Sequence, residues 1–495
     1  MKPQPAAPFG LIDELSCYYD TRAEPNNVHV EALVPGGLDY QALRQAVADA
    51  LAATPRARGR MAAGGPLRGR YTWEFPSVLD VDPVSRATWA DERELGAVRA
   101  RFLATAPSLR HSPPVLLLLA SGPDADCVLL NAHHAALDGL SCLGLLRDIG
   151  ARYRVITAAG EPASGATASQ QAGQGHDPAG MTGAERLIAA APGLPPESHP
   201  DHSSAADHSS PADHGSSDRG PSPLARARAV AGLLRQRPAR IAALPGPRGR
   251  RDGVGVHLLL VPSVPRPPGA TVNDVLLTAL IATIGRWNAA HRKRLRPVRI
   301  TVPVDARGPD SRQATGNHSA IVPVTAYPPG AGDDLSPLLA EVTRQTSALR
   351  HARPRQPSAG VLGVAPGWCP VLLKRLAVRL ALRVVGRIVC DTCLLTNLGN
   401  VTDPPWSGAG GPVRMAMTSA ARMPRGLSVG VVTADGQLQL AFRYRYAQFD
   451  AAAAARFAAS YAAVLDELGK EAVSEGGNTR AVAGRTAQDP RVPGR

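Results

Sequence analysis

The pattern of hydrophobic and polar positions divides the chain into two blocks of alternating predicted strands and helices, separated by a long polar segment. In the first block, apolar runs at Val28–Val34, Val115–Ala120 and Cys127–Asn131 predict strands, the last two joined by a polar turn as antiparallel neighbours. Leu43–Leu51 carries apolar residues on one face at helical spacing, which predicts an amphipathic helix. The opening stretch Pro8–Tyr19 predicts a strand followed by a turn.

The second block opens with Thr271–Ile284, where an N-cap threonine and Asp274 at the capping-box position predict the start of a helix. A β-rich run at Val298–Val304 predicts a strand. Farther on, apolar residues on both sides of an Asp-Gly turn predict a hairpin over 426–446, and Ala451–Leu468 predicts a terminal helix. Both blocks therefore combine strands with helices.

The polar segment between the blocks differs sharply in composition from its surroundings. From about Thr157 to Pro223 it consists mainly of Ala, Gly, Ser, Pro, Asp and His, with a short near-repeat. It has too little apolar surface to offset the entropy lost on ordering, so we predict disorder and assign no metal site to its histidines. Helical character returns over Leu224–Ala243. The predicted parts are an N-terminal lobe, a linker, a C-terminal lobe and a disordered tail, at residues 1–155, 156–249, 250–470 and 471–495.

Length and charge narrow the possible classes of protein. A chain of 495 residues is too long for one ordinary core and suits two domains with additional segments. The net charge of +14 would fit a nucleic-acid-binding protein, but nearly all of the positive charge is arginine. Abundant Ala, Pro and Gly indicate the codon bias of a GC-rich genome, and no zinc-finger, helix-turn-helix or RNP pattern is present. We therefore expect no nucleic-acid partner.

The cysteines and the apolar runs bear on the cellular compartment. The six cysteines are scattered, mostly in apolar stretches, which is typical of reduced core thiols. Cys390 and Cys393 form a lone CxxC without a second pair, so no metal site is predicted. The N-terminus has no signal-peptide core, and no uncharged apolar run reaches the ~18 residues that a membrane span needs. We expect a soluble, cytoplasmic protein.

The stretch that carries the candidate chemistry is Asn131–Ser141, between an apolar strand and a helix-like pattern. Side chains in such a loop project into a cleft while a rigid sheet holds them. His134, preceded by His133, titrates near neutral pH and can take a proton from a hydroxyl or amine that attacks a carbonyl, with Asp138 as an ionic strut. Gly139 allows a sharp bend and a close approach of substrate. Taken singly, a His-His pair and an Asp-Gly dipeptide favour an ordinary loop and turn.

Together these residues match HHxxxDG, and here the chain resembles the superfamily of chloramphenicol-acetyltransferase-like acyltransferases. That superfamily includes nonribosomal peptide condensation domains, actinobacterial polyketide-associated acyltransferases and wax-ester synthase/diacylglycerol acyltransferases. Ser141 fits as well, since condensation domains often carry Ser shortly after the Asp-Gly. Further segments resemble the family in the same order along the chain, namely Thr54–Arg58, Thr271–Ile284, Pro303–Arg307, Gly316–His318 and Leu394–Asn400.

The resemblance implies an α/β fold of two chloramphenicol-acetyltransferase-like lobes, each a mixed β-sheet flanked by helices, with the active-site channel between them. It implies that His134 is the general base, with the preceding histidine in support. An arginine of the second lobe commonly pairs with the motif aspartate, so Arg307 is the candidate partner of Asp138, which then orients the loop and shuttles no proton. The Gly139 amide is a candidate donor to the oxyanion. Asn397 either orients a substrate carbonyl or ends a strand.

The implied function is acyl transfer from a thioester to a hydroxyl or amine acceptor, in lipid or secondary-metabolite biosynthesis. The sequence has no phosphopantetheine-attachment segment and no adenylation motifs, so the donor would be an acyl-CoA or a separate acyl carrier protein, and no bound cofactor is expected. Two alternatives stay open. One is a stand-alone condensation enzyme that forms an amide, and the other is a catalytically silent scaffold, against which the intact motif argues. We expect a monomer.

The predicted helix Val371–Arg387 is a candidate partner surface. Arg375, Arg379, Arg383 and Arg387 recur at four-residue spacing and form one cationic stripe. The ordinary interpretation is a solvated helix face. The functional alternatives are a dock for an acidic acyl carrier protein or for CoA phosphates, and a peripheral membrane contact.

Overall fold

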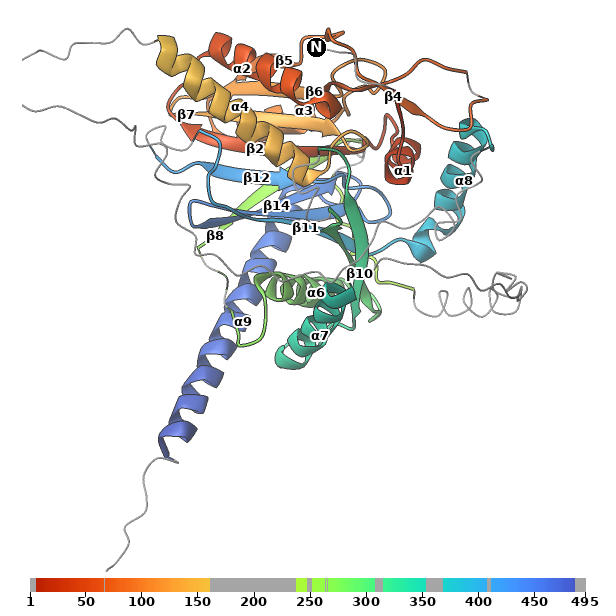
Figure 1. Cartoon of the computed structure of the whole chain (residues 1–495). Coiled ribbons are helices and arrows are strands. Elements are labelled where there is room, and N and C mark those ends of the chain that lie inside the picture. Colours follow the sequence, from red (N-terminus) through yellow and green to blue (C-terminus); the bar gives the residue numbers. More distant parts are fainter. Residues whose placement is uncertain are drawn as a thin grey trace, which may run out of the picture. The chain divides into compact units, whose positions relative to one another are not determined.

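The fold comes from a computed structural model that describes residues 6–65, 67–160, 237–246, 252–262, 264, 266–307, 315–352, 368–406 and 411–485. Most of the predicted disordered segment and the end of the tail lie outside the described residues. Within them, two β-sheets with covering helices form two lobes, accompanied by a small three-stranded sheet (Figure 1). None of the described helices combines the length and the apolar character needed to cross a bilayer.

The first lobe is built on a five-stranded sheet in the order β12-β2-β7-β6-β5. β7 (Ala125–His133) lies at its centre and runs antiparallel to both neighbours. Its side chains are buried on both faces, since Val128 and Leu130 belong to one core cluster and Cys127 and Leu129 to another. A strand packed on both faces holds the loop that follows it in a fixed position. The other elements of this lobe are β2 (Asn27–Pro35), β5 (Val84–Thr88), β6 (Val115–Ser121), α2 (Tyr40–Ala53), α3 (Glu92–Leu103) and α4 (Gly139–Gly160).

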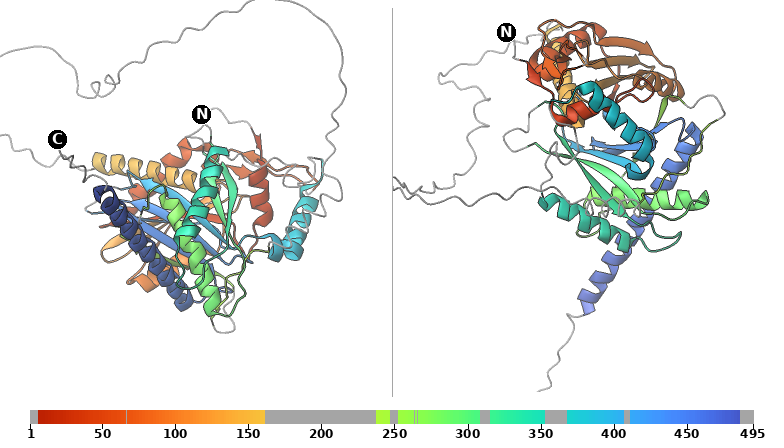
Figure 2. Two further views of the ribbon diagram at one scale, coloured as in Figure 1. Left: turned by 90° about the horizontal axis from the view of Figure 1, so that it is seen from below. Right: turned by 90° about the vertical axis from the view of Figure 1, so that its right-hand side faces the viewer.

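The second lobe is built on a six-stranded mixed sheet in the order β10-β9-β11-β13-β14-β8. β11 (Cys393–Val401) runs parallel to β9 and β13, and the remaining pairs are antiparallel. Helices α6, α7 and α9 lie on one side of this sheet (Figure 2) and contribute side chains to its core. The elements are β8 (Val254–Val261), β9 (Val298–Asp305), β10 (Ser319–Ala326), β13 (Leu427–Ala434), β14 (Gln437–Arg445), α6 (Val272–Ala290), α7 (Ser336–Ala352) and α9 (Ala451–Arg485).

One strand crosses from the second half of the chain into the first lobe. β12 (Arg414–Thr418) pairs antiparallel with β2 at the edge of the five-stranded sheet, with Met417 opposite Val30. β12 also packs tightly on β13, because a Cβ at Gly430 would lie 1.9 Å from the Met417 carbonyl oxygen. Position 430 therefore has to be glycine, and the two sheets are joined here by direct backbone contact.

The N-terminal elements differ from the prediction. Only Ala7–Pro8 (β1) is a strand and Leu11–Tyr19 forms helix α1, so the strand and turn predicted over Pro8–Tyr19 are wrong. The Gly10 N–H donates to Asp13 Oδ2 at 3.1 Å, and two carboxylates in the first turn suit the positive end of the helix dipole. The start of α1 is thus marked by acidic residues in its first turn, a signal that apolar periodicity does not detect. The remaining elements are η1 (Pro55–Arg58), β3 (Arg60–Met61), β4 (Thr72–Glu74) and α8 (Val371–Val389).

The capping box of α6 and the hairpin of β13 and β14 are confirmed. Thr271 Oγ1 accepts the Asp274 N–H at 3.3 Å, and Asp274 Oδ2 accepts the Thr271 N–H at 2.8 Å. The hairpin turns at Asp435 and Gly436, both of which have positive φ. The α/β architecture of two lobes, each a mixed sheet flanked by helices, is confirmed as well.

Two predictions at the edges of the second lobe fall partly outside the described residues. Of the helical segment predicted over Leu224–Ala243, only residues 237–243 lie within the described residues. They form no helix, because Pro238 lacks an N–H donor and disfavours helical geometry in the residue before it. Ala242 instead packs into the second-lobe core, and its N–H donates to Asn288 Oδ1 at 2.8 Å. At the other end, α9 continues to Arg485, whereas the sequence predicts a disordered tail over residues 471–495.

Candidate active site

The loop that carries the candidate chemistry connects the central strand β7 to α4. β7 ends at His133 and α4 begins at Gly139. The Ala136 N–H donates to the His133 carbonyl at 2.9 Å, which closes a tight turn. The apolar loop residues Ala135, Ala136 and Leu137 are fully buried in the first-lobe core. These contacts fix the loop, so the polar side chains at its two ends have defined positions.

Asp138 caps α4 and binds the second lobe at the same time. Its Oδ1 accepts the Ser141 N–H at 2.8 Å, as an N-cap side chain does, and its Oδ2 accepts the His318 N–H at 2.9 Å. Arg307 Nη2 lies 3.0 Å from Oδ1 and 2.9 Å from Oδ2, so the expected contact between the lobes is present. The side chains of Asp138 and Arg307 are only 2% and 3% exposed. A carboxylate occupied in this way holds the loop and is poorly placed to carry a proton.

Ser141 and the segment Gly316–His318 complete this contact. Ser141 Oγ donates to the Gly316 carbonyl at 2.9 Å, and it accepts the Gly316 N–H at 3.1 Å and Arg307 Nη2 at 2.8 Å. The Asp138 N–H donates to the same Gly316 carbonyl at 3.0 Å. The backbone of Gly316–His318 is therefore what the first-lobe loop binds, a role that its sequence did not indicate.

His134, the candidate base, is held through its backbone by both lobes. Its N–H donates to the Asn26 carbonyl at 3.0 Å, and its own carbonyl accepts Asn317 Nδ2 at 2.9 Å. The residue is half-buried, and its Nδ1 is buried without a hydrogen-bond partner among the described residues. Burial lowers the pKa of His134 below the ordinary imidazole value, although the nearby Asp138 acts in the opposite direction. A lowered pKa favours the neutral imidazole, the state that a general base requires.

His133 is fixed by a different set of contacts. Its Nδ1 accepts the Ala135 N–H at 3.0 Å, so the proton of the neutral ring sits on Nε2. Nε2 lies 3.8 Å from Asp20 Oδ2. Burial raises the pKa of Asp20, but the contact with His133 lowers it, and the net shift is downward. Because both ring nitrogens of His133 face partners and the residue is 2% exposed, it is suited to positioning.

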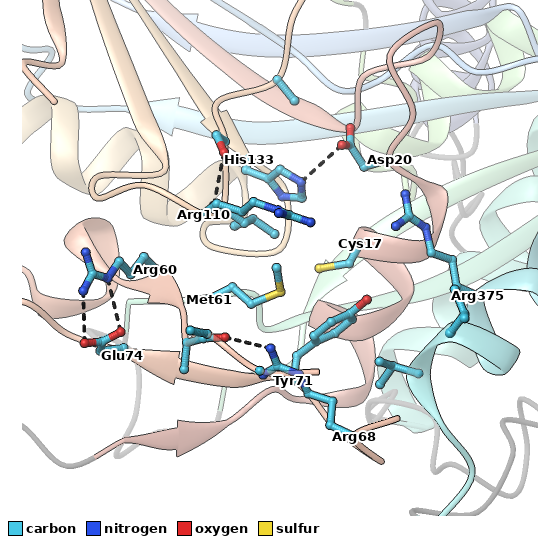
Figure 3. Close-up of a pocket in the computed structure, with 18 of the residues that line it drawn as sticks. Cys17, Asp20, Arg60, Met61, Arg68, Tyr71, Glu74, Arg110, His133 and Arg375 are labelled. Atoms are coloured by element: carbon cyan, nitrogen blue, oxygen red, sulfur yellow. Dashed lines mark hydrogen bonds and ion pairs between the residues drawn. The ribbon is translucent and has the colours of Figure 1, made fainter. Parts of the chain in front are cut away.

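A cavity of about 820 Å³ lies beside the loop, with His133 and Asp20 in its wall (Figure 3). The other walls come from α1, the region of β3 and β4, residues 106–110 and the start of α8. His134 is not among the lining residues, so the cavity reaches the motif at its first histidine. The volume is that of a small-molecule site. Polar and sulfur-containing lining residues include Arg60, Arg68, Arg110, Arg375, Cys17, Met61 and Tyr71.

Burial disfavours the thiolate form of Cys17, which lines the cavity, and of Cys393 in the second-lobe core. Burial raises the pKa of the Cys17 thiol well above its usual value, and the charges of Asp13 and Asp20 raise it further. Burial likewise raises the pKa of Cys393 to about 12. In the part of the chain that the structure describes, no three His, Cys, Asp or Glu side chains gather into a group that could bind a metal ion. Among these groups, the neutral imidazole of His134 is the best candidate for accepting a proton.

Gly139 and Asn397 lie near the loop in arrangements that differ from those expected. Gly139 does not have a positive φ, so the bend itself does not require glycine. A Cβ at this position would lie 3.0 Å from Leu398 Cδ2 and from Met417 Cε, so the glycine permits a close approach of β11 and β12. Asn397 Oδ1 accepts the Gly399 N–H at 2.8 Å beside the irregularity in β11. That oxygen is thus engaged in its own strand.

Three of the predicted site residues, Asp138, Ser141 and Arg307, are directly hydrogen-bonded to one another. His134 is linked to them through Asn317 of the segment Gly316–His318. Asn26 and Asn317, which hold the backbone of the candidate base, are not among the predicted site residues. The only indication in the sequence for Asn317 is that its segment, Gly316–His318, follows Pro303–Arg307 in the same order as in the family. Asn26 acts through its main-chain carbonyl, which any residue type provides, so no sequence pattern indicates it.

No protein-family model matches the chain. Two relatives from Mycobacterium tuberculosis, uncharacterized protein Rv2305 of strain H37Rv and uncharacterized protein MT2362 of strain CDC 1551, are each 29% identical over 91% of this chain and 96% of their own. Among solved structures, the first condensation domain of the CDA synthetase matches with a TM-score of 0.58 and 16% identity, over 94% of this chain and 97% of its own.

Two further solved structures extend this likeness. The epimerization domain from the third module of tyrocidine synthetase B has a TM-score of 0.54 and 15% identity, over 96% of this chain and 99% of its own. A mutant starter condensation domain of rhizomide synthetase RzmA, in complex with C8-CoA and Leu-SNAC, has a TM-score of 0.57 and 14% identity, over 94% of this chain and 95% of its own. The chain therefore has the fold of condensation domains, as predicted. This fold alone does not select a reaction, because one neighbour is an epimerization domain.

Proposed function

We propose that this protein is an acyltransferase that moves an acyl group from a CoA or carrier-protein thioester to a hydroxyl or amine acceptor. The observation that supports it most is the placement of His134, a half-buried imidazole whose backbone both lobes hold and whose pKa burial lowers. The neighbouring Asp138 is already occupied by Arg307 and by two backbone N–H groups. His134 is therefore the proposed proton acceptor, and Asp138 and Arg307 are proposed positioning residues.

In the proposed reaction, the acceptor oxygen or nitrogen attacks the thioester carbonyl while His134 takes its proton. The tetrahedral oxyanion needs hydrogen-bond donors. The N–H of Gly139 is the candidate, because the first amides of a helix have no partner within the helix. Collapse of the intermediate breaks the C–S bond, and the leaving thiolate takes the proton that His134 holds. No acyl-enzyme forms, and the protein returns to its starting state.

The cavity beside His133 is the proposed entrance for the acyl donor. Guanidinium groups pair well with phosphates, and Arg68, Arg110 and Arg375 line this cavity. Arg60 is less available, because it already pairs with carboxylates of β4 and of the following loop. The CoA or carrier-bound phosphopantetheine of the donor carries such phosphates. The C8-CoA bound to the rhizomide synthetase domain belongs to that protein, and it supports an acyl-CoA as a donor for a chain of this fold.

The alternative is a stand-alone condensation enzyme that forms an amide between carrier-bound substrates. The likeness to the first condensation domain of the CDA synthetase favours it. It would use the same base and the same positioning residues, so only the acceptor distinguishes the two reactions. A silent scaffold protein would need none of the arrangement around His134.

The experiment that tests the proposal follows free thiol release from a panel of acyl-CoAs and acyl carrier proteins, with and without alcohols or amines. Acceptor-dependent release that is lost in His134→Gln supports acyl transfer, and mass spectrometry of the product separates an ester from an amide. Deuterium uptake from solvent at the α-carbon of an aminoacyl thioester, without thiol release, would indicate epimerization instead. If a folded protein, as judged by cooperative unfolding, reacts with no combination of donor and acceptor, the scaffold hypothesis is favoured.

A further inference from the structure

The cationic face of helix α8 lies against the protein, whereas the ordinary interpretation of its sequence is a cationic face exposed to solvent. Arg379 donates from Nη2 to the Asp20 carbonyl at 3.0 Å, next to the end of α1. Lys374 is 4% exposed, and its Nζ donates to the Gly69 carbonyl at 2.9 Å. Arg375 faces the cavity beside the candidate site (Figure 3). Most of the described cations of α8 therefore face the protein.

The outer face of α8 is apolar. Large side chains recur along it at four-residue spacing and lie next to one another on one side of the helix. They are between 54% and 66% exposed, and Trp368, just before the helix, is 80% exposed. Contiguous apolar surface of this kind marks an interaction site. Its members are Leu372, Leu373, Leu376, Leu380 and Val384, and we call them the leucine row.

The charges around the leucine row narrow the choice of partner. α8 contains no Asp or Glu from Val371 to Val389, and Arg383 is exposed beside the row. The whole chain carries a net charge of +14. Pairing two copies of α8 face to face would bring two cationic helices together without a carboxylate between them. A helix with an apolar row, an exposed arginine beside it and no acidic residue fits the boundary between the acyl chains and the phosphates of an anionic membrane.

We propose that α8 binds the surface of an anionic phospholipid bilayer, with the leucine row among the acyl chains and Arg383 among the phosphates. The same helix forms part of the cavity wall through Val371, Leu372 and Arg375. A bilayer on the outer face of α8 would therefore lie close to the cavity. If the proposed acyl transfer is correct, an acyl donor or acceptor that partitions into lipid would be delivered next to the site.

Flotation with vesicles of phosphatidylcholine, with and without phosphatidylglycerol, tests the proposal. We expect the full-length protein to float with the anionic vesicles, and less so with rising salt, because the phosphate contacts are screened. Leu376→Asp together with Leu380→Asp should weaken binding roughly tenfold or more, because two apolar side chains are replaced by charges that disfavour insertion. Neither residue lines the cavity, so thermal unfolding and thiol release from a short-chain acyl-CoA should stay as in the wild type.

The matched control is Ile321→Asp with Tyr327→Asp, which are 58% and 66% exposed outside α8 and should not change flotation. The proposal is overturned if the wild type fails to float with anionic vesicles, or if the α8 variant floats as well as the wild type. It is also overturned if light scattering detects a dimer that the α8 substitutions dissociate while vesicle binding is absent. That result would assign the leucine row to a second copy of the chain. None of these outcomes depends on the acyltransferase activity.

Discussion

Separating the charges of Asp138 and Arg307 is the sharpest test of how the candidate site is built. In Arg307→Gln, the Asp138 carboxylate keeps two backbone N–H donors but loses its counter-charge. Asp138→Asn keeps an N-cap side chain, since Asn caps helices as well as Asp does. It removes the buried counter-charge of Arg307, which keeps only the partly exposed Asp305, and it sets an NH₂ group against other donors. Removing one member of a buried pair typically costs about 3–5 kcal/mol. We expect the arginine variant near the lower end and the aspartate variant near the upper end.

The measurement is a four-variant cycle of urea unfolding, with thiol release recorded for each protein. The double variant should be more stable than the sum of the single losses predicts, by about 1–3 kcal/mol, because no unpaired charge is left. Asp305→Asn is the control. Asp305 binds Arg307 Nη1 at 2.9 Å, but its side chain is 40% exposed, so its loss should cost less than about 1 kcal/mol. Additivity of the two single substitutions within roughly 0.3–0.5 kcal/mol would refute the coupling.

Three further predictions concern the base and the linker. His134→Ala should lower turnover by about 10²–10⁴ with little change in unfolding, whereas His133→Ala should lose less turnover and more stability; wild-type turnover by the first variant would contradict the mechanism. Because burial lowers the pKa of His134, kcat/KM should rise with pH on a limb below about pH 6.5. Folding stability should fall on acidification in the same range, since the unfolded chain binds the proton more readily than the folded chain. A kcat/KM limb above that pH would argue against His134 as the base. Replacing residues 161–223, which follow the end of α4 at Gly160, with a short flexible linker should leave melting temperature and activity nearly unchanged, and a large drop would reveal an ordered segment.

The candidate loop was predictable because local sequence encodes most of it. The apolar run of β7 and the spacing between Asp138 and Ser141 are sufficient to predict a strand, a turn and a capped helix. The long-range contact with Arg307 followed from the order of family-like segments. What the sequence could not indicate is the part made by main-chain groups of Gly316–His318, because a carbonyl or an N–H looks the same in every residue.

The pairing of β12 with β2 and the orientation of α8 could not be predicted for a different reason. β12 is a short apolar strand, and nothing within Arg414–Thr418 identifies β2, far earlier in the chain, as its partner. α8 has one cationic and one apolar face, and either could be predicted to point inward. The negative end of α1 decides the matter, since Arg379 donates to the carbonyls of Tyr18 and Asp20 at the end of that helix. Such a choice depends on the neighbouring element and not on the helix itself.

The contacts around the loop also bear on where substrate choice arises. Gly316–His318 binds Ser141, Asp138 and the backbone of His134 together. The buried first-lobe loop and this second-lobe segment therefore hold the candidate base and its supports at fixed mutual distances. Under the proposed acyl transfer, discrimination between acyl donors would then arise in the cavity walls. Those walls include the start of α8, so the helix proposed to touch lipid is also placed to influence which donor enters.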